Sequence, residues 1–411
     1  MSARATGQVS KSSAGVFAIR ARADASAVPG RPGEGGLPAF NGTIPAPLIR
    51  VRRGELVQVR VVNDLSDALT VHWHGMRVPN AMDGVPHLTQ MPIAPGGAFE
   101  YRFAPPDAGT FWYHARLSPG LATRTLYGAL IVDESAPVQV DRDALLVLDD
   151  WQAARPATTG ISAPQATIHG SGSSEIAVRT NERLRLRLVN ASLRSWTLRL
   201  ERHRVMVAAI DGLPTQPYYA RDGRLVLGPG NRMDMFVDAL LEPGAAAPMV
   251  LEGNPDIPLA RIIYDAASPI RTFPLAEAAP LPASGLPERM DFQRALKLDI
   301  PIEAKSAAQP DLQALAKGRA VFSVKRGRTV MLGLVNRTGA TQAMHLHGHH
   351  FRLLDTLDDG WKPFWLDTLP IPALQTGRIA FVADNPGKWL IRCHPLGEQE
   401  GSFVQWFEVT A

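Results

Sequence analysis

Two short histidine motifs, HWHG and HLHG, lie far apart in the chain. The first contains His72 and His74, and the second contains His345 and His347. In an extended strand, residues i and i+2 point to the same face, so each motif presents two imidazoles side by side. Imidazole sets of this kind suit copper, with zinc as the main competitor. A single pair is weak evidence for a metal site, because histidine pairs without a metal are commoner.

A third histidine accompanies each motif. His114 lies in FAPPDAGTFWYHAR (103–116), His394 lies in FVADNPGKWLIRCH (381–394), and these two segments align with each other. The pairs and the third histidines therefore occupy corresponding positions of two repeats. This repetition favours a metal site at the interface between the repeats over a set of unrelated structural histidines.

One pattern of residues recurs three times along the chain. It consists of a strand, a tight polar turn and an alternating strand that ends in Val-Asn. The three copies are IRVRRGELVQVRVVNDL (49–65), IAVRTNERLRLRLVNAS (176–192) and FSVKRGRTVMLGLVNRT (322–338). The pattern predicts an all-β protein in which one β-sandwich domain occurs three times in succession.

The spacing of the repeats predicts the domain boundaries. We expect a first domain at 1–137 with HWHG and WYHAR, a second at 138–285 without a ligand motif, and a third at 286–411 with HLHG and RCH. The Pro- and Ala-rich stretch 272–290 is typical of a linker into the third domain. The middle domain has no histidine pair, and we expect it to act as a spacer or a wall.

The composition narrows the class of protein. The chain has 411 residues, of which 45% are hydrophobic and 20% charged, as expected of a globular protein. The net charge of +4 comes from scattered basic residues, which argues against nucleic-acid binding. No run is apolar and long enough to span a membrane. The first 23 residues lack the apolar core of a signal peptide, so the chain is either cytoplasmic or a processed form with an added methionine.

The histidine motifs stand among further segments that resemble the multicopper oxidases, which include laccases and bilirubin oxidases. These segments are FNGTIPAPLIRVRRGE (40–55), MDGVPHLTQMPI (82–93) and LYGALIVD (126–133). The resemblance implies three cupredoxin-like Greek-key β-sandwich domains. It also implies a trinuclear copper cluster between the first and third domains, a type 1 copper in the third, and a periplasmic or secreted location.

The resemblance implies eight histidine positions around the trinuclear cluster, and six of them hold histidine in this chain. The type 2 copper would bind two of these histidines and one type 3 copper would bind three, namely His72 and His345 for the first ion and His74, His114 and His394 for the second.

The second type 3 copper would bind His347 and two further histidines, but Arg116 and Arg392 stand at those two positions. A guanidinium stays protonated and has no free lone pair, so it is a poor copper ligand. The two arginines would either neutralise the vacant copper position or hold an anion there. Ion pairs with nearby carboxylates are the alternative.

The type 1 copper site has lost most of its expected ligands. The family pattern places two histidines and a cysteine where this chain has Gln342, Glu398 and Cys393, with Phe403 at the axial position. A blue copper site needs the thiolate together with two imidazoles. We therefore interpret Cys393, the only cysteine of the chain, as a buried thiol.

Other residues around these motifs match the family pattern only in part. Asp83 matches an acidic residue that the resemblance places near the type 2 copper, where it would orient bound water and help proton delivery. Leu396 stands where some relatives carry a second acidic residue. Because the type 1 site and one type 3 position are also incomplete, we do not expect the complete four-electron reduction of O2. We interpret His87 as a surface loop histidine rather than a spare ligand, and His349 and His350 as structural.

These residues together predict a copper-binding oxidoreductase with one or two coppers and no working type 1 site. The ions would occupy the two-histidine and three-histidine sets side by side, or His347 would join His72 and His345 around a single ion. A small-molecule substrate would be oxidised with O2 beside the cluster.

In this hypothesis Asp83, Arg116 and Arg392 are the catalytic residues. A non-catalytic scaffold with the same fold is an alternative from a different class of protein. Copper sequestration is a third hypothesis, but the eleven methionines are dispersed rather than gathered in a copper-binding loop.

Overall fold

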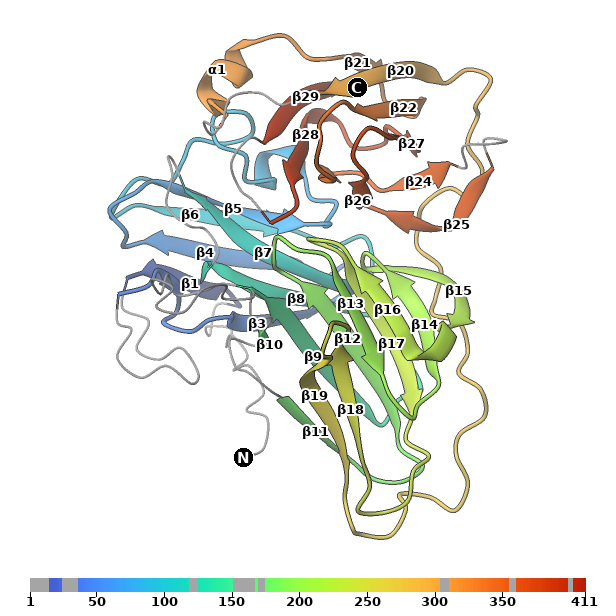
Figure 1. Ribbon diagram of the computed structural model, residues 1–411. Helices are drawn as coiled ribbons and strands as arrows, with labels where there is room; N and C mark the ends of the chain where they lie inside the picture. The colour runs from blue at the N-terminus through green and yellow to red at the C-terminus, as the bar shows by residue number, and fades with distance from the viewer. Residues whose placement is uncertain are drawn as a thin grey trace.

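The computed structural model describes residues 15–23, 36–117, 125–150, 167–168, 174–303, 310–354, 360–397 and 402–411. These residues form six β-sheets, two in each of three consecutive sandwiches (Figure 1). The predicted all-β fold with three cupredoxin-like domains is confirmed. The N-terminal segment that bears on a signal peptide lies largely outside the described residues.

The first sandwich packs a sheet of order β2-β1-β4-β6 against a sheet of order β3-β8-β7-β5. A short 3-10 helix, η1 (Asn80–Met82), follows β5. The strands are β1 (Phe17–Arg22), β2 (Ala39–Phe40), β3 (Ala46–Arg52), β4 (Val57–Asn63), β5 (Leu69–His74), β6 (Ala98–Phe103), β7 (Gly109–Leu117) and β8 (Tyr127–Asp133).

The second sandwich has sheets of order β10-β9-β12-β17-β14-β15 and β11-β19-β18-β13-β16. A 3-10 helix, η3 (Arg221–Gly223), precedes β16. The strands are β9 (Arg142–Asp149), β10 (Thr167–Ile168), β11 (Ser174–Val178), β12 (Arg183–Asn190), β13 (Trp196–Leu200), β14 (Val205–Ile210), β15 (Leu213–Tyr219), β16 (Arg224–Leu227), β17 (Arg232–Asp238), β18 (Ala246–Leu251) and β19 (Ile257–Tyr264).

The third sandwich has sheets of order β20-β22-β27-β24-β25 and β21-β29-β28-β23-β26. Helix α1 (Leu312–Lys317) begins after Asp311, whose carboxylate accepts hydrogen bonds from two backbone amides of the first turn. The strands are β20 (Leu296–Ile302), β21 (Ser323–Lys325), β22 (Thr329–Asn336), β23 (Gln342–Leu346), β24 (Phe351–Leu354), β25 (Trp361–Leu366), β26 (Thr368–Ile371), β27 (Thr376–Val382), β28 (Gly387–Pro395) and β29 (Phe403–Thr410).

The threefold sequence repeat corresponds to equivalent strand pairs in the three sandwiches. Its Val-Asn ends β4, β12 and β22, and each asparagine is buried. The side-chain amides of Asn63, Asn190 and Asn336 each donate to at least two backbone carbonyls of neighbouring loops. The repeated asparagine is therefore a structural anchor, because it satisfies loop carbonyls that would otherwise be buried without a partner.

The histidine motifs lie on equivalent strands, β5 in the first sandwich and β23 in the third. Trp73, between the two histidines of HWHG, is fully buried in the core of the first sandwich, and Leu346 is buried in the same way in the third. Because side chains alternate along a strand, these two apolar residues direct the flanking imidazoles to the opposite face. The equivalent strand of the middle sandwich, β13, carries no histidine.

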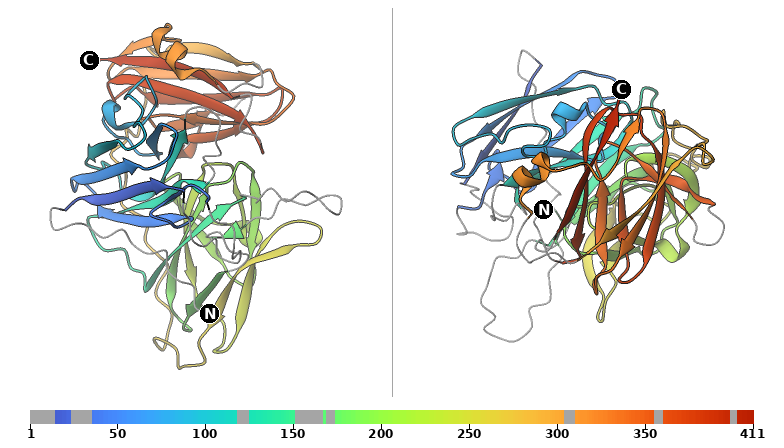
Figure 2. Two further views of the ribbon diagram at one scale, coloured as in Figure 1. Left: turned by 90° about the vertical axis from the view of Figure 1, so that its left-hand side faces the viewer. Right: turned by 90° about the horizontal axis from the view of Figure 1, so that it is seen from above.

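The three sandwiches surround a common interface. The third lies above the first in Figure 1, and the second lies below both, an order that the left view of Figure 2 also shows. The chain runs from the second to the third through 272–290, which contains no helix or strand. Within the described residues, no helix has the length and apolar character needed to cross a membrane.

Candidate metal centre

The strands of the first and third sandwiches present matching residues to the interface. In the first, β5 pairs with β7, which sets His72 opposite His114 and Thr70 opposite Arg116. In the third, β23 pairs with β28 in the same antiparallel register. That register sets His345 opposite Arg392 and Ala343 opposite His394. Histidine and arginine therefore exchange places between the two strand pairs, as the alignment of the repeats predicts.

His72 and His345 face each other across the interface, with their Nε2 atoms 3.2 Å apart. The Nδ1 atom of His72 donates to the backbone carbonyl of Asp83 at 2.8 Å, and Nδ1 of His345 donates to that of Asp367 at 2.9 Å. Each bond requires a proton on Nδ1, so a neutral imidazole in this position carries its lone pair on Nε2. Two lone pairs then face each other, and this arrangement needs a proton or a cation between them.

His74 and His114 lie beside this pair. One nitrogen of each lies within 4.8 Å of the others in a group that also includes His72. Nδ1 of His114 is 3.4 Å from its acceptor, the Ala115 carbonyl, whereas Nε2 of His74 lies 2.9 Å from the Thr368 hydroxyl oxygen. Burial lowers the pKa of both imidazoles well below 6.5. They are therefore neutral near pH 7, which is the form that binds metals.

His394 lies on the same pocket wall but is more distant. Its Nδ1 donates to the Pro395 carbonyl at 3.2 Å, and burial lowers its pKa to about 4. Among the groups of described residues whose ligand atoms lie within 4.8 Å of one another, none includes His394. His394, the third predicted ligand of the three-histidine set, would have to move closer to His74 and His114 before all three could bind one ion.

His347 is held by hydrogen bonds at both ring nitrogens. Its Nδ1 donates to the Asp83 carboxylate at 2.9 Å, and its Nε2 accepts from a guanidinium nitrogen of Arg116 at 2.9 Å. One ring nitrogen of His347 also belongs to a group of possible ligand atoms with His72 and His345. Because the Arg116 N–H already points at this lone pair, the imidazole is neutral and is not free to bind an ion.

Burial lowers the pKa of the Arg116 guanidinium to about 9, with a further decrease from the positive charge of Arg392 and an opposing effect of Asp83. Burial alone would raise the pKa of the Asp83 carboxyl, but the interactions with His347 and His72 outweigh burial and lower it. The carboxylate therefore stays ionised. Arg116 is therefore a cation at neutral pH. Its hydrogen-bond partner is an imidazole, not the carboxylate that an ion pair would require.

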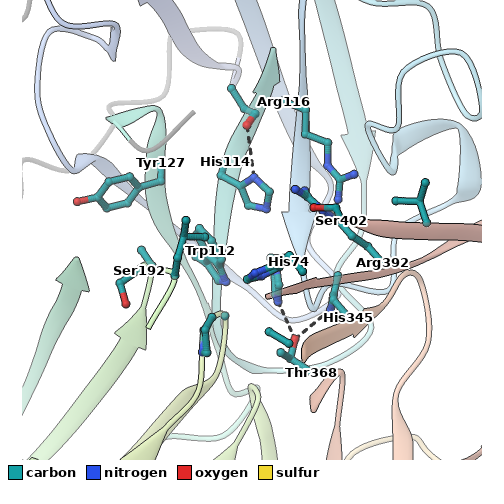
Figure 3. Close-up of a pocket in the computed structure, with 18 of the residues that line it drawn as sticks. His74, Trp112, His114, Arg116, Tyr127, Ser192, His345, Thr368, Arg392 and Ser402 are labelled. Atoms are coloured by element: carbon teal, nitrogen blue, oxygen red, sulfur yellow. Dashed lines mark hydrogen bonds between the residues drawn. The ribbon is translucent and has the colours of Figure 1, made fainter. Parts of the chain in front are cut away.

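A pocket of about 160 Å³ opens beside these residues. Figure 3 shows Arg116 and Arg392 reaching one part of it, with His114, His74 and His345 along the adjoining wall. The middle sandwich contributes Ser192 and its neighbours, together with the 229–230 turn. The middle domain therefore acts as a wall of the pocket.

The middle sandwich also supports the centre with a buried ion pair. The guanidinium of Arg232, at the start of β17, donates to both oxygens of Asp367 at 2.9 and 2.5 Å. Asp367 precedes β26, its backbone carbonyl accepts from His345, and its carboxylate accepts from the Thr368 hydroxyl at 2.8 Å. The sequence analysis missed Arg232, Asp367 and Thr368, since none of them lies in a ligand-type motif.

The type 1 position offers little to a copper ion. Cys393 is fully buried, and burial raises the pKa of its thiol, so the thiolate is disfavoured. The Gln342 amide donates to the Thr338 hydroxyl at 3.0 Å, and Phe403 is paired opposite Cys393 on β29. Glu398 lies outside the described residues.

The remaining residues singled out in the sequence lie around this centre. His349 packs against three aromatic rings of the third sandwich, and Nε2 of His350 lies 3.4 Å from the Asp367 carboxylate. His87 is half-buried in a turn with a positive φ of 63°. Leu396 is half-buried and donates its backbone amide to the Thr341 carbonyl.

The residues fit copper at part of the family's usual set of positions. The facing lone pairs of His72 and His345 fit one ion, and the neutral imidazoles of His74 and His114 offer ligands beside it. The position next to His347 does not fit an ion, because the Nε2 lone pair of this histidine already accepts a hydrogen bond from Arg116. The type 1 position does not fit one either, because Cys393 has no imidazole partner among the described residues there.

Comparison with known proteins agrees with this architecture. Family models described as multicopper oxidase match residues 28–137, 142–246 and 289–410. Lac15 from a marine microbial metagenome is 32% identical and has a TM-score of 0.79, over 96% of this chain and 99% of that one. A multi-copper oxidase structure from Pseudomonas thermotolerans is 28% identical with a TM-score of 0.81, over 96% and 99% of the chains.

A curated relative gives the same result at the level of sequence. Multicopper oxidase MmcO from Mycobacterium tuberculosis is 29% identical over 86% of this chain and 79% of its own length. The matches cover all three sandwiches, including the strands that carry the six histidines. The chain belongs to the multicopper oxidase family.

Proposed function

We propose that this chain is a copper-dependent oxidoreductase with a reduced centre of one or two coppers between its first and third domains. The observation that carries the proposal is the approach of the Nε2 atoms of His72 and His345, which lie 3.2 Å apart in the interface. Both imidazoles are fixed by backbone carbonyls in the tautomer that binds metal. His74 and His114 would bind a second ion or complete the first.

Copper held there would supply one-electron redox chemistry and an open position for O2. The protein residues around it orient the ligands and balance charge. The Asp83 carboxylate accepts from Nδ1 of His347, and its backbone carbonyl fixes His72. Because the pKa of Asp83 is lowered, we assign it to electrostatic stabilisation and orientation rather than to proton donation.

The substrate would be a small molecule bound in the pocket beside the centre. The usual electron entry site of the family depends on a type 1 copper, and the buried Cys393 lacks the imidazoles for it. Direct contact between the substrate and the centre removes the need for that route. The pocket wall already carries His74, His114 and His345, so a bound molecule would lie next to the ligands.

Metal content per chain tests this proposal. Protein loaded with copper and then desalted should hold about one or two coppers by plasma mass spectrometry, as the available imidazole sets allow. The variant His72→Ala/His345→Ala should lose at least one of them, whereas His203→Ala, in the middle domain, should not. O2 consumption with a phenolic substrate, measured with an oxygen electrode, should depend on the same two histidines.

Other results of the copper and O2 measurements would favour other functions. Absence of bound copper would favour the non-catalytic scaffold, and bound copper without O2 consumption would favour sequestration. A full set of four coppers would contradict our account of the arginines and of Gln342. An extracytoplasmic location stays a prediction from the family resemblance.

A further inference from the structure

We propose that Arg116 and Arg392 form a receptor for the carboxylate of a small aromatic acid, which the pocket holds beside the metal centre. This inference rests on the proposed function in one respect, because it names the class of substrate for that site. The binding of the acid itself needs only the side chains of the pocket.

The first argument is the incomplete pairing of the two guanidiniums. Arg116 is only 8% exposed, and its Nε has no hydrogen-bond partner among the described residues, although one terminal nitrogen donates to His347. Within the part of the chain that the structure describes, Arg392 makes no ion pair and donates no side-chain hydrogen bond. An unpaired buried cation is costly, and a second cation beside it raises that cost. An anion between the two guanidiniums would remove both penalties.

The second argument is the local charge. Among the described residues, Asp83 is the one acidic group that acts on Arg116. Its carboxylate and the two guanidiniums leave a formal excess of one positive charge within that set. A monoanion restores neutrality before any metal binds. The oxygens of Asp83 already accept from His347, so this carboxylate is not available to bridge the arginines.

The third argument is the shape and lining of the pocket. Its volume of about 160 Å³ suits a small molecule. Beyond the arginines and imidazoles the wall is largely apolar and includes an indole and a phenol ring (Figure 3), with Trp112, Tyr127, Leu193, Ala343 and Val404 as its members. A guanidinium binds a carboxylate through parallel hydrogen bonds, and an aromatic body would pack on the apolar wall. The two ends of such a ligand therefore match the two parts of the pocket.

Isothermal titration of the full-length, copper-free chain with benzoate tests the inference. Benzoate should bind with one site per chain, and benzamide, which has nearly the same shape but no charge, should bind at least about tenfold more weakly. The variant Arg392→Gln should weaken benzoate binding by about 10- to 100-fold, and Arg392→Lys by less. Arg221→Gln, a change at an exposed arginine, is the matched control and should have no effect.

Equal affinity for benzoate and benzamide in the unmodified protein would overturn the inference, even if no arginine variant folds. So would full benzoate affinity in an Arg392→Gln variant with an unchanged circular dichroism spectrum. Benzoate binding that appears only in Glu398→Gln/Glu400→Gln would overturn it as well, because the guanidiniums would then belong to a carboxylate of the chain.

The titration also separates this inference from the proposed function. Arginine-dependent benzoate binding in a protein that neither holds copper nor consumes O2 would uphold the anion site and reject the oxidoreductase. Copper-dependent oxidation without any preference for benzoate over benzamide would do the reverse.

Discussion

At the scale of single residues, the contact between Arg116 and His347 explains how the centre differs from a complete cluster. The guanidinium donates to the imidazole nitrogen that would otherwise bind a metal, and the other nitrogen is held by Asp83. Arg392 lies opposite His345 on β28, so the third sandwich carries the same replacement of histidine by arginine. The two arginines thus convert a potential metal position into a cationic one, while the ligands on the other side stay available.

Returning both arginines to histidine should restore a copper position. In Arg116→His/Arg392→His, Nε2 of His347 is released and two new imidazoles stand at the positions that the family uses. We expect the copper content to rise by about one ion per chain relative to the parent, measured by plasma mass spectrometry after desalting. The control Arg116→Gln/Arg392→Gln removes the same charges without adding imidazoles, and equal copper in both variants would contradict the prediction.

His349 should make stability depend on pH. Burial among three aromatic rings lowers the pKa of His349 from 6.5 to about 4. Between these values the unfolded chain binds a proton that the folded chain does not, so the free energy of unfolding falls as the pH falls from about 6.5 to about 4. The contribution of this histidine is up to about 3 kcal/mol.

The variant His349→Gln should show a smaller fall in unfolding free energy over that window, measured by urea titrations at several pH values. Phe381→Leu, a change in the same cluster, controls for lost packing, because it should lower stability without altering the pH dependence. A pH dependence in His349→Gln as steep as that of the parent would assign the effect to other groups.

At the scale of elements, the sequence predicts which strands carry the ligands but not what holds them in place. Alternation and the repeat put the histidines on one face of β5 and of β23, because Trp73 and Leu346 must be buried. Arg232 and Asp367 have no such signal: they lie 135 residues apart and meet only because the middle sandwich packs against the third. Contacts of this kind depend on domain packing, which a local pattern does not contain.

Removing the Arg232 guanidinium should destabilise the interface strongly. Arg232→Leu leaves the Asp367 carboxylate buried without its partner, which costs roughly 3–5 kcal/mol. It should also weaken copper binding, because Asp367 fixes His345 through its backbone carbonyl. Urea unfolding and copper content measure the two effects. Arg224→Leu, which breaks a solvent-exposed pair with Glu252, is the control and should cost about 1 kcal/mol or less. A similar cost for both variants would show that the buried pair is not essential.

At the scale of the whole molecule, the metal centre joins two domains that also meet through other contacts. Arg77 of the first domain bridges Asp107 and Asp384, and the Asn80 amide donates to the Lys388 carbonyl of the third at 2.6 Å. These contacts hold β5 and β23 near each other before a metal binds. Copper therefore binds to a site that is already formed, and its free energy of binding adds to the free energy of unfolding of the chain.

Copper should accordingly stabilise the full chain through the two facing histidines. At a free copper concentration about 100-fold above its dissociation constant, binding to the folded state alone adds about 2.7 kcal/mol to the free energy of unfolding. Urea titrations with and without copper should show this gain in the parent and in His203→Ala, and a smaller gain in His345→Ala, where one facing lone pair is missing. An equal gain in His345→Ala would place the stabilising ion elsewhere in the fold, because only an ion held between the first and third domains depends on a ligand from each of them.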